Sequence, residues 1–429
     1  MHLHSCHTIF YLSTDKVHRT MNDLFSRWFI PTSQSSLLTA QSALLSYFVK
    51  SEVHARQLRL ARSQNHINYI ELRRKGISDS SSGSSSSGGC SGSSSSNDKD
   101  VSQQKTLVLM HGLGCGLGFF FSNYDHLLQH YDRVYALDWI GMGGSSRPNF
   151  PARSIMSDII DRLNGQELKV PFGIEPLVNT NIRESTDFFI DAFEEFRETM
   201  KIRNFTLAGH SLGGFLSAKY CIKYPDQVKN LALISPVGLP SPPPRDNHAP
   251  VSTSMSFLRA AWANNVTPMS ILRVAGPRGK NYTKDMLDRR FRRERANGTL
   301  KWERHEVDLI SEYLYHITVA KASGELAMNS LLMPVFYRKH DRLRGGVFAR
   351  EPVLDDVART CCQHNIKLLV QFGDNDWLHY DEAAQDIEYI NKKYIGCNAK
   401  LDIIEAAGHH LYIENPIGFY KSLKDWDRH

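Results

Sequence analysis

The chain has 429 residues, of which 41% are hydrophobic and 22% charged, a balance typical of an ordinary globular protein. A net charge of +6 is too small to indicate a nucleic-acid partner, although it would suit work at an anionic membrane surface. No uninterrupted apolar run reaches 18 residues, so the sequence predicts no transmembrane helix.

The N-terminus favours an intracellular protein. Residues 1–20 contain four histidines where a secretory signal would have an unbroken apolar core. Acidic residues are few there, which leaves a mitochondrial presequence as an alternative. The seven cysteines show no CxxC spacing, so we expect free thiols in a reducing compartment.

Residues 1–77 form an N-terminal segment, and the Ser/Gly-rich stretch at 78–100 predicts a flexible linker. The segment contains an expected helix with one apolar face. This face consists of Leu37, Leu38, Leu44, Leu45 and Phe48. It would either pack on the main domain or contact lipid, and the upstream residues 28–30 (Trp-Phe-Ile) support lipid contact.

After the linker, strand-like and helix-like segments alternate, which predicts an α/β fold with a mostly parallel sheet. The expected strands are 106–110, 133–138, 205–208, 231–234, 366–372 and 401–404. Helices are expected over 185–200 and from about residue 416 to the C-terminus. We assign residues 101–238 and 362–429 to this core.

Residues 239–361 contain no strand-like run, and their patterns look helical. More than a hundred residues is far too long for a simple connection between two strands. The interval therefore predicts a helical cap inserted over the functional site. A shorter insertion at 149–184 lies where it would join the same cover.

The strand at 205–208 runs into Gly209-His210-Ser211-Leu212-Gly213, and a helix follows. A strand, Gly-x-Ser-x-Gly and a helix together are typical of a nucleophile elbow, with Ser211 at a strained turn. The flanking glycines remove side chains that would clash with the neighbouring elements. Two backbone N–H groups are expected to form the oxyanion hole, that of Leu212 and that of Leu113 in the His111-Gly112-Leu113-Gly114 loop.

A general base and an acid must follow the serine in chain order. His409 follows Gly408 directly after the last expected strand and is our general base, with His410 as the alternative. Asp376 lies three residues after Gly373 and is our acid, with Asp374 as the alternative. Asp376 would orient the imidazole of His409 and stabilise its charged form.

These motifs resemble the lipid-acting group of α/β-hydrolases that contains α/β-hydrolase-domain proteins four and five, a plant lysophosphatidate acyltransferase and the fungal cardiolipin deacylase. The resemblance extends from about Trp28 to Trp426 and includes 138–148 (DWIGMGGSSRP), 209–215 (GHSLGGF) and 373–377 (GDNDW). It implies an α/β-hydrolase fold and a serine hydrolase that removes acyl chains from phospholipids or lysophospholipids. Cardiolipin, phosphatidic acid and N-acyl-phosphatidylethanolamine are among the lipids implied.

The group also carries a His-x4-Asp motif linked to acyl transfer to lysophosphatidate. In this chain the motif falls on His409 and Glu414, so glutamate replaces the aspartate. A lysophosphatidate acyltransferase that uses the same acyl-enzyme, or a non-catalytic lipase co-activator, is therefore an alternative. Co-activators of the group have Asn in place of the nucleophile, whereas this chain has Ser211.

Two cap clusters have either a functional or a plain structural interpretation. Basic residues would hold phosphate head groups or form a solvated face, and they are Arg289, Arg290, Arg292, Arg293, Arg295, Arg338, Lys339, Arg342 and Arg344. Apolar residues would line an acyl channel or belong to the core, and they are Met328, Leu331, Leu332, Met333 and Phe336. The mechanism needs neither a metal nor an organic cofactor, and we expect peripheral attachment to a membrane or lipid droplet.

Overall fold

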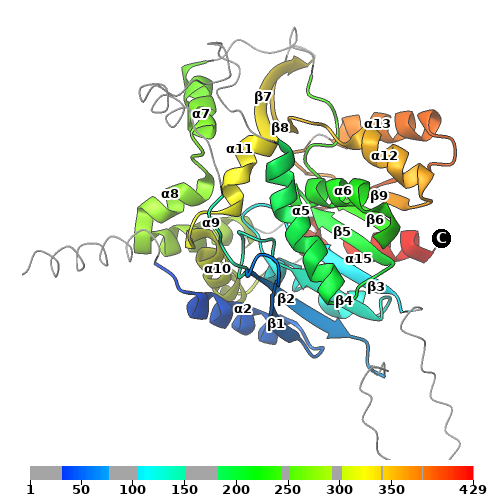
Figure 1. The fold of residues 1–429 in the computed structure, drawn as a ribbon. Helices are drawn as coiled ribbons and strands as arrows, with labels where there is room; N and C mark the ends of the chain where they lie inside the picture. The colour runs from blue at the N-terminus through cyan, green and yellow to red at the C-terminus, as the bar shows by residue number, and fades with distance from the viewer. Residues whose placement is uncertain are drawn as a thin grey trace, which may run out of the picture.

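An eight-stranded sheet runs through the centre of the protein, whose computed structural model describes residues 31–76, 104–150, 182–243, 252–291, 302–339, 342–378 and 380–428. The strand order is β1-β2-β4-β3-β5-β6-β9-β10 (Figure 1). Six strands run parallel: β3 (Thr106–Met110), β4 (Arg133–Leu137), β5 (Phe205–His210), β6 (Val228–Ile234), β9 (Lys367–Gly373) and β10 (Lys400–Ile404). These are the six strands that the sequence predicts, and the α/β fold is confirmed.

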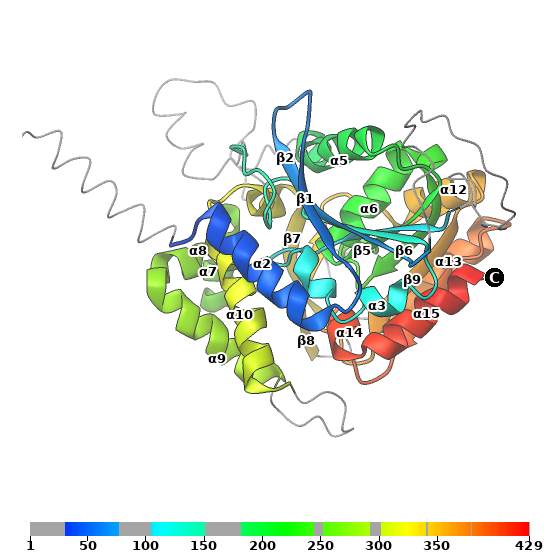
Figure 2. The ribbon, with the colours of Figure 1, turned by 90° about the horizontal axis from the view of Figure 1, so that it is seen from below.

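Each face of the sheet has its own core, because successive side chains of a strand point to opposite faces. In β3, Val108 and Met110 join the core beneath one helical layer, whereas Leu107 and Leu109 join the other. The first layer comprises α5 (Ile182–Thr199), α6 (Leu212–Lys223), α12 (Leu354–Gln363) and α13 (Tyr380–Lys393). Across the sheet lie η2 (Leu117–Phe120), α3 (Tyr124–Leu127), α14 (Leu411–Glu414) and α15 (Pro416–Arg428) (Figure 2).

The N-terminal segment contributes two strands that the sequence analysis missed. Strand β2 (His66–Arg73) pairs antiparallel with β4, and β1 (His54–Arg59) pairs antiparallel with β2 at the edge of the sheet. The sequence of β1, HARQLR, carries almost no apolar alternation because an edge strand is mostly solvated. The core therefore begins before the linker, and not at residue 101.

Helix α2 (Gln34–Phe48) packs on the main domain. Leu37, Leu44 and Leu45 are buried, and the helix lies against η2 and cap helix α10 (Figure 2). The alternative that this apolar face contacts lipid is therefore wrong for the three buried leucines. The upstream residues 28–30 and the Ser/Gly linker lie outside the described residues.

The inserted segment contains helices and also a hairpin. Its helices are α7 (Thr253–Ala263), α8 (Pro268–Ala275), η5 (Gly276–Arg278), α9 (Gly279–Phe291), α10 (Arg304–Val319), η6 (Gly324–Leu326) and α11 (Ala327–Leu331). Strands β7 (Leu332–Lys339) and β8 (Arg342–Ala349) form an antiparallel pair, so the expectation of a purely helical segment is wrong. The apolar residues of β7 could equally have formed a buried helix, because a short apolar run does not distinguish a strand from a helix.

Helix α12 also differs from the predicted boundaries. It starts at Leu354, packs on α6 and α13, and therefore belongs to the core, although we assigned residues up to 361 to the cap. The insertion predicted at 149–184 lies almost wholly outside the described residues. No disulfide joins the five cysteines that the structure describes, which are Cys115, Cys221, Cys361, Cys362 and Cys397.

Candidate active site

Ser211 lies between the end of β5 and the start of α6, with φ 54° and ψ −118°. A positive φ is strained for a residue with a Cβ, and such strain collects at functional sites. The turn is tight: a Cβ on Gly209 would lie 2.4 Å from the Gly213 carbonyl oxygen. The Ser211 N–H donates to the carbonyl of Ile234 at 2.9 Å, which fixes the turn to β6.

His409 and Asp376 converge on this serine from the loops after β10 and β9. His409 Nε2 lies 3.0 Å from Ser211 Oγ, and His409 Nδ1 lies 3.1 Å from Asp376 Oδ1. The Asp376 side chain is fully buried. Because an ionised carboxylate can only accept a hydrogen bond, His409 Nδ1 carries the hydrogen, and Nε2 is left to accept a hydrogen bond from the Ser211 hydroxyl.

The two alternatives named from the sequence have other contacts. Asp374 accepts hydrogen bonds from the N–H groups of Ala406 and Ala407, both at 2.9 Å, and so shapes the loop before His409. The His410 ring nitrogen Nε2 lies 3.4 Å from Cys115 Sγ. The structure thus brings Asp376 and His409, the preferred pair, to Ser211.

His210 is a positioning residue whose role sequence reasoning missed. Its Nε2 lies 2.8 Å from the carbonyl oxygen of His409, and its Nδ1 lies 3.2 Å from the Tyr412 hydroxyl. The first contact requires a proton on Nε2, and the second then uses the lone pair on Nδ1. His210 therefore links the elbow directly to the loop that carries the base. In the sequence, the only indication of this role is the position of His210 directly before the serine of the Gly-x-Ser-x-Gly motif.

The loop after β3 lies against the elbow, as an oxyanion hole requires. A Cβ on Gly112 would lie 2.9 Å from Ser211 Cβ, and one on Gly213 would lie 2.3 Å from the His111 carbonyl oxygen. Leu212 is the first residue of α6, where an N–H has no intrahelical acceptor. Within the described chain, neither the Leu212 nor the Leu113 N–H donates to another backbone carbonyl.

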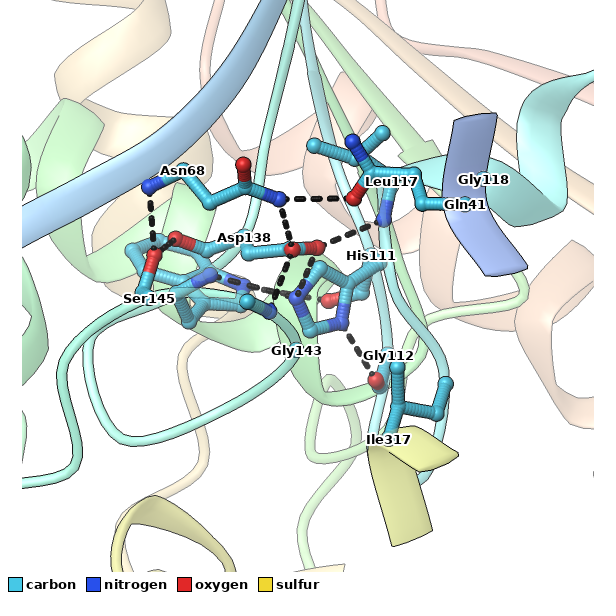
Figure 3. Close-up of polar contacts among 12 residues, drawn as sticks. Gln41, Asn68, His111, Gly112, Leu117, Gly118, Asp138, Gly143, Ser145 and Ile317 are labelled. Atoms are coloured by element: carbon cyan, nitrogen blue, oxygen red, sulfur yellow. Dashed lines mark hydrogen bonds and ion pairs between the residues drawn. The ribbon is translucent and has the colours of Figure 1, made fainter. Parts of the chain in front are cut away.

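A buried carboxylate, Asp138, supports this loop from the end of β4 (Figure 3). It accepts hydrogen bonds from the N–H of Leu117 at 2.7 Å, the N–H of Gly144 at 2.8 Å and the side chain of Asn68 at 2.7 Å. The same Asn68 amide donates to Gln41 of α2 at 2.8 Å. The N-terminal segment is therefore connected to the loops around the elbow.

His111 is fully buried in this network and neutral. The N–H of Trp139 donates to His111 Nε2 at 3.1 Å, so Nδ1 carries the proton and donates to the Gly112 carbonyl at 2.8 Å. Burial lowers the pKa of His111, and the nearby carboxylate of Asp138 opposes this only in part. Burial also holds the pKa of the Tyr124 and Tyr313 phenols far above its ordinary value, so both stay protonated.

An apolar pocket lies near the three residues. Val237, whose N–H donates to the Ser211 carbonyl, lines it together with Trp377, whose ring lies 5.1 Å from that of His409. Leu378, Phe348 and Ile387 extend the lining toward β8 and α13. Ser211 and His409 do not line the pocket themselves, so it offers an apolar chain a place one contact away from them.

The two cap clusters predicted from the sequence do not line this pocket. Met328, Leu331 and Leu332 are buried in the core, which agrees with their structural interpretation. Among the basic residues, Arg289, Arg338 and Arg344 lie within the described chain, outside the linings of the pockets beside the elbow. The side chains of Arg290, Lys339 and Arg342, and residues 292, 293 and 295, lie outside the described residues.

Residues 105–416 match the family model for the α/β-hydrolase fold. The chain belongs to this family. It is 30% identical over 332 residues to the mouse protein named 1-acylglycerol-3-phosphate O-acyltransferase ABHD5, a match covering 76% of this chain and 78% of that protein. It is also 30% identical to the mouse (lyso)-N-acylphosphatidylethanolamine lipase, covering 72% and 75%. Within the family the chain thus belongs to the group of α/β-hydrolase-domain proteins four and five.

A further relative is the 1-acylglycerol-3-phosphate O-acyltransferase of Arabidopsis thaliana, 30% identical over 74% of this chain. The chain spans about two thirds of the length of the two plant relatives, 65% of this one and 66% of the rice protein. Among solved structures, a bromoperoxidase from Bacillus anthracis matches with a TM-score of 0.50 and 15% identity, covering 88% of this chain and all of that one, which supports the fold alone.

Cys115, His210 and His410 form the one group, among the described residues, whose ligand atoms would reach a common metal ion. Both ring nitrogens of His210 are engaged by His409 and Tyr412, so the set does not present three open ligands. Helices long and apolar enough to cross a bilayer do not occur in the described parts of the chain.

Proposed function

We propose that this chain is a serine hydrolase that removes acyl chains from phospholipids or lysophospholipids. The observation that carries the proposal is the hydrogen-bonded series from Ser211 Oγ through His409 to buried Asp376. This is the arrangement of a nucleophile, a general base and an orienting acid. The lipid class rests on the names of relatives, which are a phospholipid lipase and lysophosphatidate acyltransferases.

Catalysis then follows the acyl-enzyme route. His409 takes the proton of Ser211 as Oγ attacks the acyl carbonyl, and the N–H groups of Leu113 and Leu212 stabilise the oxyanion. His409 returns the proton to the departing lysolipid alkoxide. Water, activated by the same histidine, hydrolyses the acyl-Ser211 ester and releases the fatty acid. No step needs a metal or an organic cofactor.

Acyl transfer is the second candidate, because the acyl-enzyme also accepts a hydroxyl of lysophosphatidate. Two features bear on it: the names of three relatives, and Glu414 at the acid position of the group's His-x4-Asp motif. The Glu414 carboxylate is buried and accepts from the N–H of Gly408 at 2.5 Å. Glu414 therefore holds the loop that carries His409. Whether hydrolysis or acyl transfer occurs depends on the competition between water and lysophosphatidate for the acyl-enzyme.

We further propose that the protein works at a membrane or lipid-droplet surface inside the cell, with the mitochondrion as one candidate location. Cap helices α7 and α8 expose large apolar side chains, with Phe257 77%, Ile271 66% and Val274 65% exposed. Such exposed apolar groups on a basic protein suit an anionic lipid surface. Phosphatidic acid, cardiolipin and N-acyl-phosphatidylethanolamine are the substrates to test first.

The test is acyl release by purified protein from vesicles of mixed anionic phospholipids, read by mass spectrometry. Wild type and Ser211→Ala are run in parallel, with and without lysophosphatidate. Fatty acid and lysolipid released by wild type alone support the hydrolase, with Ser211→Ala at least about 10⁴-fold slower. New phosphatidate instead of free acid supports acyl transfer. Equal behaviour of both proteins refutes serine catalysis on lipids and favours the co-activator.

A further inference from the structure

A small cavity lies between cap helix α8 and the loop that carries the candidate oxyanion donor. Its lining includes Gly114, Cys115, Arg147, Arg273 and Glu325. Gly114 follows Leu113 directly, and a Cβ on Gly114 would lie 3.3 Å from Met269 Cε of α8. The cavity therefore borders the same loop that approaches Ser211.

Arg273 is 8% exposed, and its guanidinium is only partly satisfied. Its Nε donates to the carbonyl of Ala320 at 2.7 Å, and Nη2 pairs with Glu325. Nη1 is buried and has no hydrogen-bond partner in the described structure. A buried N–H of a charged group without an acceptor costs considerable free energy, so its presence calls for a ligand.

Arg147 adds a second positive charge at the cavity. Its guanidinium donates to the backbone carbonyls of Gly143, Ile317 and Lys321. Across the described ranges, no carboxylate lies within salt-bridge distance of it. Burial, partly offset by the carboxylate of Glu325 and reinforced by the charge of Arg273, lowers the pKa of Arg147 to about 10.

The charges of the lining leave an excess of one positive charge, because Arg147 and Arg273 face a single carboxylate, that of Glu325. Arginine offers planar, fixed N–H groups that match phosphate oxygens. In a glycerophospholipid only the glycerol backbone separates the phosphate from the ester carbonyl. A phosphate at this cavity would therefore leave the ester near the loop of Leu113 and Ser211.

We infer that Arg273 and Arg147 form a phosphate-binding subsite for the phosphate group of the lipid that is cleaved or acylated. This inference rests on the proposed function for its lipid substrate. The unpartnered Arg273 Nη1 donates to a phosphate oxygen, and Arg147 balances the second charge. The cavity is small, so it takes the phosphate itself, and any further head group lies outside. The arginine-rich cluster after α9 is not needed for this recognition.

Direct binding tests the subsite without catalysis. In a Ser211→Ala background, calorimetry compares short-chain lysophosphatidate, inorganic phosphate and the uncharged monoacylglycerol of equal chain length. We expect lysophosphatidate to bind at least tenfold more tightly than monoacylglycerol, and Arg273→Gln to abolish this preference. Inorganic phosphate should bind more weakly than lysophosphatidate. Equal affinity for lysophosphatidate and inorganic phosphate refutes the lipid assignment. If neither ligand binds, the cavity holds only water and the subsite is refuted.

Three further variants keep the test decisive if Arg273→Gln does not fold. Glu325→Gln removes the competing carboxylate and should tighten lysophosphatidate binding, whereas Arg147→Gln should weaken it. Arg350→Gln is the matched control, because Arg350 is a partly buried arginine that donates to Asn329 at another place. An effect of Arg350→Gln as large as that of Arg147→Gln would overturn the assignment.

Kinetics separate this inference from the proposed function. The ratio of kcat/KM for lysophosphatidate to that for monoacylglycerol should fall about 30-fold in Arg273→Gln. An unchanged ratio in an active enzyme refutes the subsite and leaves the hydrolase standing. If wild type cleaves neither ester, the proposed function fails, and the calorimetry still decides whether phosphate binds at Arg273.

Discussion

At the residue scale, His111 shows how the support of the site makes stability depend on pH. The imidazole is fully buried and neutral, with Trp139 donating to one nitrogen and the other donating to Gly112. Burial lowers its pKa below the ordinary value near 6.5. Below pH 6.5 the unfolded chain therefore binds a proton that the folded chain does not.

The first prediction follows from this difference in protons. The free energy of unfolding should fall as the pH is lowered from about 7 through 6.5, until the depressed pKa of folded His111 is reached. His111→Gln should remove up to about 1.4 kcal/mol per pH unit from this slope. Urea unfolding of both proteins at several pH values measures it. Measurements at pH 8 isolate the loss of packing, and equal slopes would contradict the prediction.

At the scale of elements, the site depends on how closely α6 approaches the end of β3. Gly213 in the first turn of α6 lies where a Cβ would be 2.3 Å from the His111 carbonyl oxygen and 2.8 Å from that of Met110. Both obstacles are backbone atoms, which do not move aside as a flexible side chain does. The distance between the elbow and the Leu113 loop is thus set by the absence of one methyl group.

Gly213→Ala should therefore separate α6 from this loop. We expect kcat/KM to fall at least about 100-fold, because the two oxyanion donors move apart, and stability to fall by about 2–3 kcal/mol. Ester hydrolysis and chemical unfolding measure the two effects. Ser217→Ala on the same helix is the control, since its buried hydroxyl has no partner in the described structure and its loss should change stability little. Full activity of Gly213→Ala would refute this geometry.

At the scale of the whole molecule, the cap has two differently built sides. Arg273 of α8 points inward to the cavity beside the oxyanion loop, whereas Ile271 and Val274 of the same helix are exposed. Helix α7 adds Phe257, which is 77% exposed. Helix α8 thus combines a charged side chain at the cavity with exposed apolar side chains.

The third prediction concerns these exposed apolar side chains. Replacing Phe257, Ile271 and Val274 with serine should weaken binding to anionic vesicles at least tenfold, because each lost side chain removes about 1.5–3 kcal/mol of apolar transfer. Co-sedimentation measures the binding, and the melting temperature verifies the fold. Ile395→Ser is the matched control, since Ile395 is 93% exposed and follows α13, outside the inserted segment. An equal loss in Ile395→Ser would show that any exposed apolar group contributes.

The sequence by itself determined the parallel core and named the three side chains that the structure brings together as the candidate site. Buried parallel strands are continuous apolar runs that end in Gly-rich turns, and these signals are local. The elbow around Ser211 and the order of Ser211, Asp376 and His409 are local as well. The sequence could only rank Asp376 above Asp374, because the two aspartates lie two residues apart on one loop. The contacts in the structure support Asp376, which pairs with His409, whereas Asp374 accepts from the N–H of Ala406.

Only the tertiary structure decided which distant segments support the site. Strands β1 and β2 and the β7–β8 hairpin were missed, because a solvated edge strand and short apolar runs carry weak periodicity. For α2, the structure decided between the two alternatives that the sequence left open, and the helix packs on the main domain. The contact of His210 with His409 joins residues more than a hundred positions apart, and so does the cavity that Arg273 lines together with Gly114 and Cys115. Such contacts depend on how the chain returns to the same end of the sheet, and no pattern of neighbouring residues records that.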